Sequence, residues 1–328
     1  MAQPPGIHAR RAALRLLDAV LRRGETLDVA FGAATSDIRK FEDKALARAI
    51  ASETLRWAID FDALIDSATR QNLPDDAKAR QVLRMMLAQW LRLGTPPHAV
   101  IATGLPLLSG GPRRLAHGVF STLTKREAKL PEAPTLPDTV AARWGERAQA
   151  IAAGLAEPPP LDLTLRDSAQ TEHFKTQLAA DSLMPGHLRL PRGAAVETLP
   201  GFEDGAWWVQ DLAASLPARL LGAGEGRTAL DLCAAPGGKT LQLAAQGWKV
   251  TALDISKRRL DLLKANLKRT GLSAGTIRAD ALKWEPKHRY DAILIDAPCT
   301  ATGTARRHPD VLHRIGPRQI EELTELQT

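Results

Sequence analysis

The sequence has few cysteines and no long apolar run. Its 328 residues include only two cysteines, Cys233 and Cys299, too few for a disulfide framework, so each is either a small buried side chain or a reactive thiol. No stretch approaches the roughly 20 apolar residues of a membrane-spanning helix, and the first residues lack the apolar core of a secretory signal. We therefore expect a soluble, cytoplasmic protein without a membrane segment.

Positive charge is concentrated in the first part of the chain. Residues 1–130 contain 20 Lys and Arg against 13 Asp and Glu, whereas residues 131–328 contain 24 of each, so the net charge of +7 comes from the first part. Such an excess favours a module that binds a polyanion such as a nucleic acid, but many helical domains carry it as a solvated surface. Charge alone leaves both interpretations open.

Residues 9–130 show the apolar spacing of amphipathic helices. Leu14, Leu17 and Leu21 are three and four residues apart, and this spacing recurs through the segment. Glycine and proline interrupt it at intervals of helix length, at Gly24, Pro74, residues 94–97 and residues 110–112. We predict an all-α bundle over residues 1–130.

The middle of the chain has mixed patterning. The proline-rich stretch 131–138 is typical of a linker, and a short helical segment after it closes at residues 157–160. Residues 161–166 alternate like a half-buried strand, residues 171–183 are typical of a helix, and the segments HLRLP and AAVETLPG add short extended pieces. We predict a linker and a small α+β subdomain over residues 131–220.

Beyond residue 220, short apolar strands alternate with helices. The predicted helices are 239–245 and 256–270, and the predicted strands are 228–233, 248–254, 275–280 and 290–299. Nearly all-apolar strands that alternate with helices indicate a parallel sheet covered on both faces. We predict an α/β domain over residues 221–328.

The segment LDLCAAPGGKT (230–240) places two glycines where the first of these strands turns into a helix. A phosphate-binding P-loop would need a glycine where Cys233 stands, and the dinucleotide pattern G-x-G-x-x-G is absent. Asp254 ends the next strand, where a carboxylate can accept both hydroxyls of a ribose, and Asp280 ends the third strand, within reach of an adenine amino group. Each acid alone is more often a turn residue, but together they indicate an adenosine-containing cofactor that is not a pyrophosphate.

The fourth strand ends in DAPC (296–299), which places Cys299 at the same sheet edge. Cys299 is either a buried structural cysteine or a thiol for cytosine chemistry, in which a thiolate adds to carbon 6 and carbon 5 then attacks a methyl sulfonium. In the second case Asp296 would hydrogen-bond the base. Arg306, Arg307 and His308 would then hold the RNA or DNA backbone.

These motifs resemble those of the RsmB/Sun (Fmu) family of bacterial 16S rRNA cytosine-5 methyltransferases. The likeness covers nearly the whole chain and rests on LPGFEDGAWWVQDLAAS, LDLCAAPGGKT, LDIS, DAPCTATGT and RRHPD, with LRLGTPPHAV in the first part. It implies an N-terminal NusB-like RNA-binding domain, a small RNA-contacting subdomain at about 131–220 and a Rossmann-like catalytic domain. The protein would be a monomer without a metal that acts on small-subunit ribosomal RNA.

The resemblance also implies roles for individual residues. Asp296 and Cys299 would be catalytic, with Cys299 assisting release of methylated RNA. S-adenosylmethionine would be bound by Cys233, Ala234, Ala235, Pro236, Gly237, Gly238, Lys239, Asp254, Asp280 and Asp296.

One departure from the family concerns the nucleophile. The attacking cysteine of the family lies in a T-C-S segment on a later strand, and this sequence has no third cysteine. We expect the sequence to be a fragment of a longer enzyme or a truncated gene product in which strand 290–296 has an open apolar edge, unless Cys299 substitutes, as the Pro-Cys cysteine serves DNA cytosine methyltransferases. The alternatives are a non-catalytic RNA-binding or ribosome-assembly protein and a methyltransferase of tRNA, DNA or another RNA.

Overall fold

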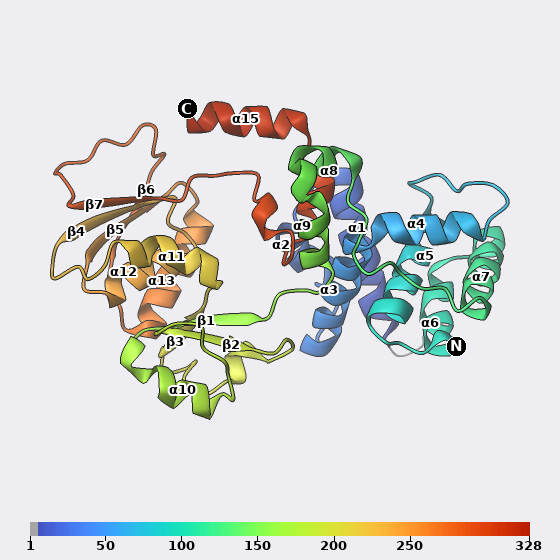
Figure 1. Ribbon diagram of the computed structural model, residues 1–328, viewed down its shortest axis with the longest axis horizontal. Helices are drawn as coiled ribbons and strands as arrows, with labels where there is room; N and C mark the ends of the chain where they lie inside the picture. Colours follow the sequence, from blue (N-terminus) through green and yellow to red (C-terminus); the bar gives the residue numbers. More distant parts are fainter. Residues whose placement is uncertain (1–5) are drawn as a thin grey trace. The chain divides into compact units, whose positions relative to one another are not determined.

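The computed structural model describes residues 6–328, which form two compact units (Figure 1). The helical unit contains the described residues up to Pro158 together with Cys299–Leu326 and Thr328, and the sheet unit contains Pro159–Pro298 and Gln327. Residues 1–5 lie outside the described residues. They belong to the predicted helical domain and to the stretch in which no secretory signal is expected. The three-part division at residues 130 and 220 stays a prediction.

The helical unit confirms the predicted all-α bundle. Gly24 ends the first helix with φ 68°, a left-handed conformation that suits glycine because it has no Cβ. Within residues 6–328, no helix is both long and apolar enough to cross a membrane. The α-helices are α1 (Ile7–Arg23), α2 (Leu27–Ala34), α3 (Phe41–Arg56), α4 (Ala58–Ser67), α5 (Lys78–Leu87), α6 (Pro97–Gly104), α7 (Gly110–Lys125), α8 (Asp138–Trp144), α9 (Ala148–Leu155), α14 (Val311–Arg314) and α15 (Pro317–Gln327); a π-helical turn (Ala88–Arg92) and 3-10 turns (Leu105–Leu107, Gly145–Arg147 and Thr302–Thr304) complete them.

Helices α1, α3 and α5 supply much of the apolar core of the helical unit. Leu16 of α1, Ile50 of α3 and Leu83 of α5 are fully buried, and they share one cluster with Phe61 and Phe120. Burying a side chain of this size stabilises the fold by about 1.5–3 kcal/mol. The three-and-four spacing in the sequence is therefore the inward face of these helices.

Segments from before and after the sheet unit pack on each other in the helical unit. Leu136 shares a small apolar core with Val311, which lies far along the sequence. Thr135 donates its backbone N–H and its hydroxyl to Asp60 at 2.9 and 2.6 Å. Residues 131–137 form no helix, as expected of a linker, but they are held against α4.

The sheet unit begins with a small antiparallel sheet. β1 (Leu161–Leu165) lies between β2 (His187–Leu190) and β3 (Trp207–Val209), and its leucines share an apolar core with α10 (Thr171–Gln177). The helix expected over 171–183 ends at Gln177, because Asp181 pairs with Arg189 beside β2. Residues 194–201, expected to be extended, contain a 3-10 turn at Val196–Thr198, and a further 3-10 turn covers Ser168–Gln170.

The second sheet is parallel, as predicted. Its strand order is β6-β5-β4-β7, and every neighbouring pair is parallel. All four strands therefore end at one edge of the sheet. The elements are α11 (Leu212–Leu220), β4 (Thr228–Leu232), α12 (Gly238–Ala245), β5 (Lys249–Asp254), α13 (Lys257–Thr270), β6 (Gly275–Arg278) and β7 (Ala292–Ile295).

The expectation that helices cover both faces of this sheet is wrong within the described residues. Helices α11, α12 and α13 pack on a single face, against alternate strand residues such as Val250 and Ala252 (Figure 1). On β7, Leu294 is buried, whereas Ile293 and Ile295 are 55% and 64% exposed. β7 pairs with β4 on one side and is an edge strand of the described sheet, so the predicted apolar edge is present.

Gly205→Ala should destabilise the sheet unit by about 3–5 kcal/mol. Gly205 has φ 62°, and a Cβ there would lie 2.1 Å from the backbone oxygen of Arg269 in α13. Gly222→Ala is the matched control, because Gly222 has φ 68° with no atom within 4 Å, which leaves only left-handed strain of about 1–2 kcal/mol. Thermal unfolding of both variants checks this; equal midpoints would contradict it.

Candidate functional site

A tight turn joins β4 to α12 at the carboxyl edge of the parallel sheet. Cys233 has φ 59°, uncommon for a residue with a side chain, and Gly237 has φ 109°. A Cβ on Gly237 would lie 2.1 Å from Cδ1 of Leu263 in α13, so glycine is required where the turn meets that helix. The N–H groups of the first turn of α12 face this edge, where they can donate to a ligand.

Asp254, at the end of β5, is bound directly to this turn. Its side chain is 1% exposed, and Oδ2 accepts hydrogen bonds from the backbone N–H of Ala235 at 3.1 Å and from Nη2 of Arg259 at 2.5 Å. Oδ1 accepts from the backbone N–H of Ser256 at 2.8 Å. The carboxylate therefore ties the glycine turn to the start of α13.

Asp296 and Asp280 follow the two outer strands. Asp296 accepts a hydrogen bond from Nζ of Lys239 at 2.7 Å and stays 60% exposed. Asp280 accepts from the backbone N–H of Leu282 at 3.1 Å and is 34% exposed. Since β6 and β7 are three strand spacings apart, the acidic side chains span roughly 14 Å along the edge, enough room for an extended ligand.

Asp231 is a buried carboxyl group that the sequence interpretation did not single out. Its side chain is 0% exposed, Oδ2 accepts the Thr240 hydroxyl at 2.6 Å, and Oδ1 has no hydrogen-bond partner. Burial raises the pKa of Asp231 to about 6, against the lowering effect of the Thr240 hydrogen bond. The sequence feature that could have identified Asp231 is its position between two leucines of an apolar strand.

Gln210 is a second residue that the sequence interpretation missed. Its Oε1 accepts from Nε1 of Trp208 at 2.8 Å, and its Nε2 donates to Oε1 of Gln242 at 3.2 Å. A Cβ on Gly238 would lie 3.5 Å from the Gln210 amide carbon. Gln210 thus supports the first turn of α12. The sequence feature that could have identified it is its position within the segment WWVQD.

The two cysteines have different surroundings. Cys233 is half-buried, and burial, with the Asp254 charge, raises the pKa of its thiol. Cys299 is exposed, and its Sγ accepts from the backbone N–H of Ala301 at 3.4 Å. Because Cys299 belongs to the helical unit and the glycine turn to the sheet unit, the cleft expected between them stays a prediction.

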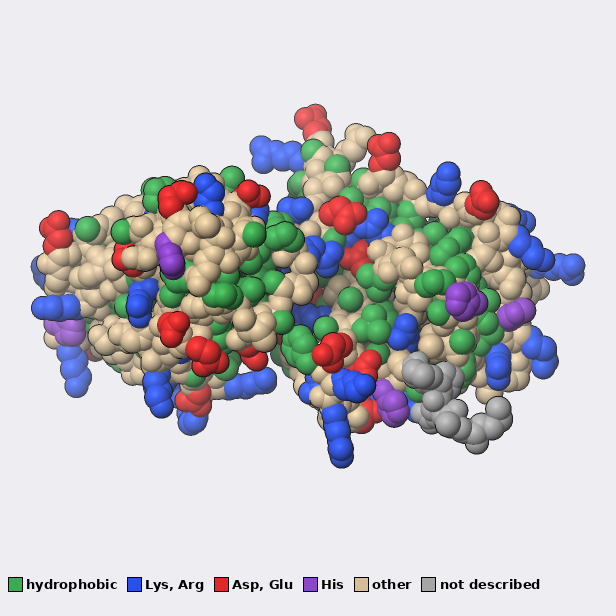
Figure 2. All heavy atoms as spheres, turned by 90° about the horizontal axis from the view of Figure 1, so that it is seen from below, with side chains coloured by type: hydrophobic (Ala, Val, Ile, Leu, Met, Phe, Trp, Pro, Cys, Tyr) green, Lys and Arg blue, Asp and Glu red, His purple; other side chains and the backbone are tan. Residues whose placement is uncertain are grey.

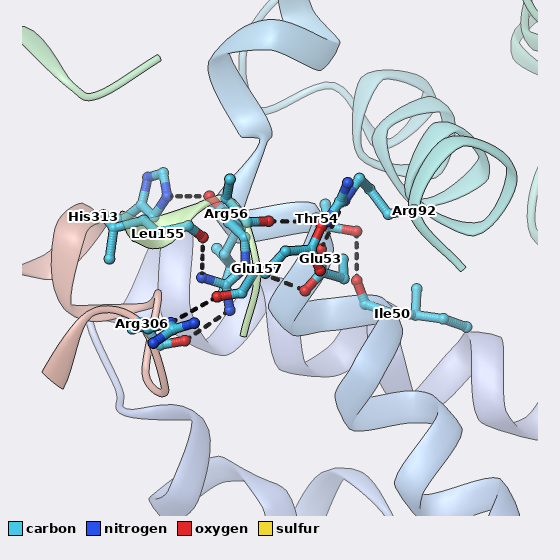
Figure 3. A network of polar contacts seen from close by, with 11 residues as sticks. Ile50, Glu53, Thr54, Arg56, Arg92, Leu155, Glu157, Arg306 and His313 are labelled. Atoms are coloured by element: carbon cyan, nitrogen blue, oxygen red, sulfur yellow. Dashed lines mark hydrogen bonds and ion pairs between the residues drawn. The ribbon is translucent and has the colours of Figure 1, made fainter. Parts of the chain in front are cut away.

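Arg306, Arg307 and His308 lie in a hydrogen-bonded turn on the helical unit. The backbone N–H groups of Arg307 and His308 donate to the carbonyl of Thr304, both at 2.8 Å. Nε of Arg306 donates to the carbonyl of Glu157 at 2.9 Å, as Figure 3 shows. The role of these three residues in RNA binding stays a prediction.

Metal ligands do not gather in the part of the chain that the structure describes. A search of residues 6–328 for groups of at least three His, Cys, Asp or Glu side chains in metal-binding arrangement finds none.

Asp231→Asn should make the sheet unit more stable at neutral pH. The pKa of Asp231 is about 6 in the folded protein and about 3.9 in an unfolded chain, so the two values differ by about 2, which corresponds to roughly 3 kcal/mol. Between these values the folded state binds more protons, so stability falls as pH rises from about 4 to about 6. Asparagine still accepts from Thr240 and does not titrate. Urea unfolding at pH 4 and pH 7.5 checks this, and a variant with the wild-type pH dependence would contradict it.

Two family models match the chain. Residues 218–328 match the 16S rRNA methyltransferase RsmB/F model, and residues 7–107 match the NusB family model. Among solved structures, the crystal structure of PH0851 covers 100% of this chain and 82% of its own, with a TM-score of 0.70 at 21% identity. NSun6 from Pyrococcus horikoshii with SFG covers 58% of this chain and 77% of its own, with a TM-score of 0.52 at 20% identity. These likenesses support the fold.

Curated relatives extend over almost the whole chain. Ribosomal RNA small subunit methyltransferase B of Xanthomonas campestris is 31% identical over 349 residues, which cover 98% of this chain and 79% of the relative. The protein of the same name from Xylella fastidiosa is 33% identical over 347 residues, with the same coverage. The chain therefore belongs to the ribosomal RNA small subunit methyltransferase B (RsmB/Sun) family of RNA methyltransferases and has an N-terminal NusB-like domain.

Proposed function

We propose that this protein transfers the methyl group of S-adenosylmethionine to carbon 5 of cytosine in small-subunit ribosomal RNA. The observation that carries the proposal is the carboxyl edge of the parallel sheet. There the glycine turn contacts Asp254, and Lys239 contacts Asp296. The family adds the substrate class, since the curated relatives are named as ribosomal RNA methyltransferases.

The residues at this edge fit S-adenosylmethionine. The glycine turn lets α12 begin close to α13, and the first turn of α12 offers N–H donors to a ligand at this edge. Asp254 would accept the ribose hydroxyls and Asp280 the adenine amino group, because carboxylates are strong acceptors for such donors. When bound, S-adenosylmethionine supplies an electrophilic methyl sulfonium.

Arg259 competes for the proposed ribose-binding carboxylate. It donates to Oδ2 of Asp254, yet its own side chain is 49% exposed, whereas that of Asp254 is 1% exposed. A half-exposed guanidinium can return to water at little cost. Ribose binding would therefore replace the Arg259 contact and keep the backbone contacts to Ala235 and Ser256.

Cytosine methylation also needs a thiol that reaches the base. Carbon 5 becomes nucleophilic only after a thiolate adds to carbon 6. Burial keeps Cys233 protonated, whereas Cys299 is exposed. We assign the base-contacting thiol to Cys299 and the hydrogen bond to the base to Asp296, which Lys239 orients. The T-C-S segment of the family does not occur in these 328 residues, and in its presence Cys299 would assist release.

Asp254→Asn should weaken S-adenosylmethionine binding about ten- to a hundredfold, because a hydrogen bond to a charged group contributes roughly 1.5–3 kcal/mol. Asp261→Asn is the control, since Asp261 lies on the exposed side of α13 and pairs with Lys257. Calorimetry measures both variants. Equal binding by wild type and Asp254→Asn, or no binding by wild type, would refute the cofactor assignment.

Transfer of a labelled methyl group to naked small-subunit rRNA tests the reaction itself. These 328 residues should label cytosine only if Cys299 supplies the nucleophile, so Cys299→Ser should abolish any transfer. In a chain that also carries a T-C-S segment, the same change should trap methylated RNA covalently, seen as a shifted band on a denaturing gel. Transfer by the 328 residues that survives Cys299→Ser would contradict both assignments.

Two other outcomes separate the alternatives. RNA binding without methyl transfer by either chain would favour a non-catalytic RNA-binding protein. Transfer to tRNA but not to rRNA would retain the chemistry and replace the substrate.

A further inference from the structure

The segment that follows Cys299 is held on the helical unit by contacts with α2 and α3. Nε2 of His313 lies 2.7 Å from the carbonyl oxygen of Leu55, and Nη2 of Arg56 donates to the carbonyl of Arg306 at 2.8 Å. Asp310 accepts from the backbone N–H of Leu27 at 3.4 Å. These contacts join residues more than 240 positions apart in the sequence, so the turn Thr304–His308, here called the arginine turn, is part of the helical surface.

Arg56 is the buried centre of this attachment (Figure 3). Its side chain is 2% exposed, pairs with Glu53 at 3.1 Å, and also donates to the carbonyl of Leu155 at 2.8 Å. Arg92 pairs with the other oxygen of Glu53 at 3.2 Å and continues to the carbonyl of Ala156 at 2.8 Å. A buried guanidinium satisfied in this way fixes its partners tightly, because each lost hydrogen bond would leave a desolvated charge.

The arginine turn adjoins cationic and apolar side chains of α2 and α3. Asp28 of α2 contacts both Arg48 of α3, at 2.5 Å, and Nδ1 of His308, at 3.6 Å, and so links the turn to α3. Arg48 also lies over the ring of Phe31, 5.5 Å from its centroid. Phe41 is seven residues before Arg48, on the same side of α3, and is 69% exposed.

We propose that α2, α3 and the arginine turn form one surface that binds single-stranded RNA, with Arg56 as its buried positioning residue. This inference rests on the proposed function and adds to it the place where the RNA lies. Arg48, Arg306 and Arg307 would contact phosphates, and the exposed Phe41 ring would stack on a base.

Single-stranded RNA is the partner that this combination fits. Unpaired bases stack on aromatic rings while arginines follow the backbone, whereas a double helix presents mainly phosphates and hydroxyls. Arg48 and His308 share the Asp28 carboxylate, and Glu42 and Asp43 lie in the first turn of α3, so the pairing of arginines with an exposed ring, and not net charge, identifies the partner. Charge alone does not locate it, since Lys and Arg side chains are scattered over the face that Figure 2 shows.

RNA titrations of the full chain at several salt concentrations test the surface. Arg48→Gln and Arg307→Gln should each weaken binding of an unstructured oligoribonucleotide about three- to tenfold and lower the slope of log affinity against log salt by about 0.7. Phe41→Ala should weaken binding without changing that slope, because stacking releases no counterion. Arg126→Gln removes the same charge beside Ser67 at the end of α4 and should leave affinity within twofold.

Arg56 and Arg92 provide the matched pair for the positioning role. Both variants, Arg56→Gln and Arg92→Gln, remove an arginine from Glu53, but only the first removes the bond to the Arg306 carbonyl. Arg92→Gln acts on the turn only indirectly, through its pair with Glu157, whose carbonyl accepts from Arg306. Hydrogen exchange at the amides of Arg307 and His308 should accelerate at least tenfold more in Arg56→Gln than in Arg92→Gln, and RNA affinity should fall with it. Arg56→Lys should restore protection partly, because one ammonium cannot replace all the contacts of the guanidinium.

The outcomes separate this surface from the proposed function. If wild type does not bind RNA at low salt, both the function and the surface fail. If wild type binds but Arg48→Gln, Arg307→Gln and Phe41→Ala bind equally well, the surface is wrong and the function stands. Equal exchange in Arg56→Gln and Arg92→Gln would remove the positioning role of Arg56, even where both variants lose stability.

Discussion

The parallel pairing of β4 with β5 on one side and β7 on the other determines where the proposed cofactor residues lie. Because parallel strands all end at the same edge, the glycine turn after β4, Asp254 after β5 and Asp296 after β7 meet there although they are far apart in sequence. Hydrogen bonds from the Ala235 amide to Asp254 and from Lys239 to Asp296 then join these strand ends. The proposed chemistry depends on this edge, since no single segment supplies more than part of it.

Two buried ionisable side chains differ in how well their surroundings satisfy them. In the sheet unit, Asp231 is inaccessible and has one unpartnered oxygen. In the helical unit, Arg56 is equally buried, but Glu53 and two backbone carbonyls satisfy it. Ionisation of Asp231 lowers the stability of the fold, whereas Arg56 stabilises the arrangement of α3 with the segments that contain Leu155 and Arg306. A buried carboxyl group beside the proposed cofactor-binding turn fits the pattern of functional sites that retain electrostatic strain.

The helical unit is more than an N-terminal domain. Val311 and Leu312 complete an apolar core with Leu136 and Leu155, and the arginine turn lies on α2 and α3. Residues 306–313, which follow Cys299, are therefore positioned by helices whose own sequence lies at the other end of the chain. RNA bound to α2 and α3 would contact the segment that carries the proposed base-contacting thiol, which links substrate binding to the reaction.

The sequence alone determined the features that depend on local pattern or on the geometry shared by all parallel sheets. Helical spacing gave the all-α bundle, apolar strands alternating with helices gave the parallel sheet, and strand-end residues such as Asp254 were predictable because strand direction places them at one edge. The tertiary structure decided what depends on distant partners: that Asp231 is buried without a full set of hydrogen bonds, that helices cover one face of the sheet, and that residues 299–315 pack on the helical unit. Arg56 illustrates the reason. Nothing within α3 distinguishes it from the half-buried Arg48 eight residues earlier, because its role comes from carbonyl groups 99 and 250 positions away.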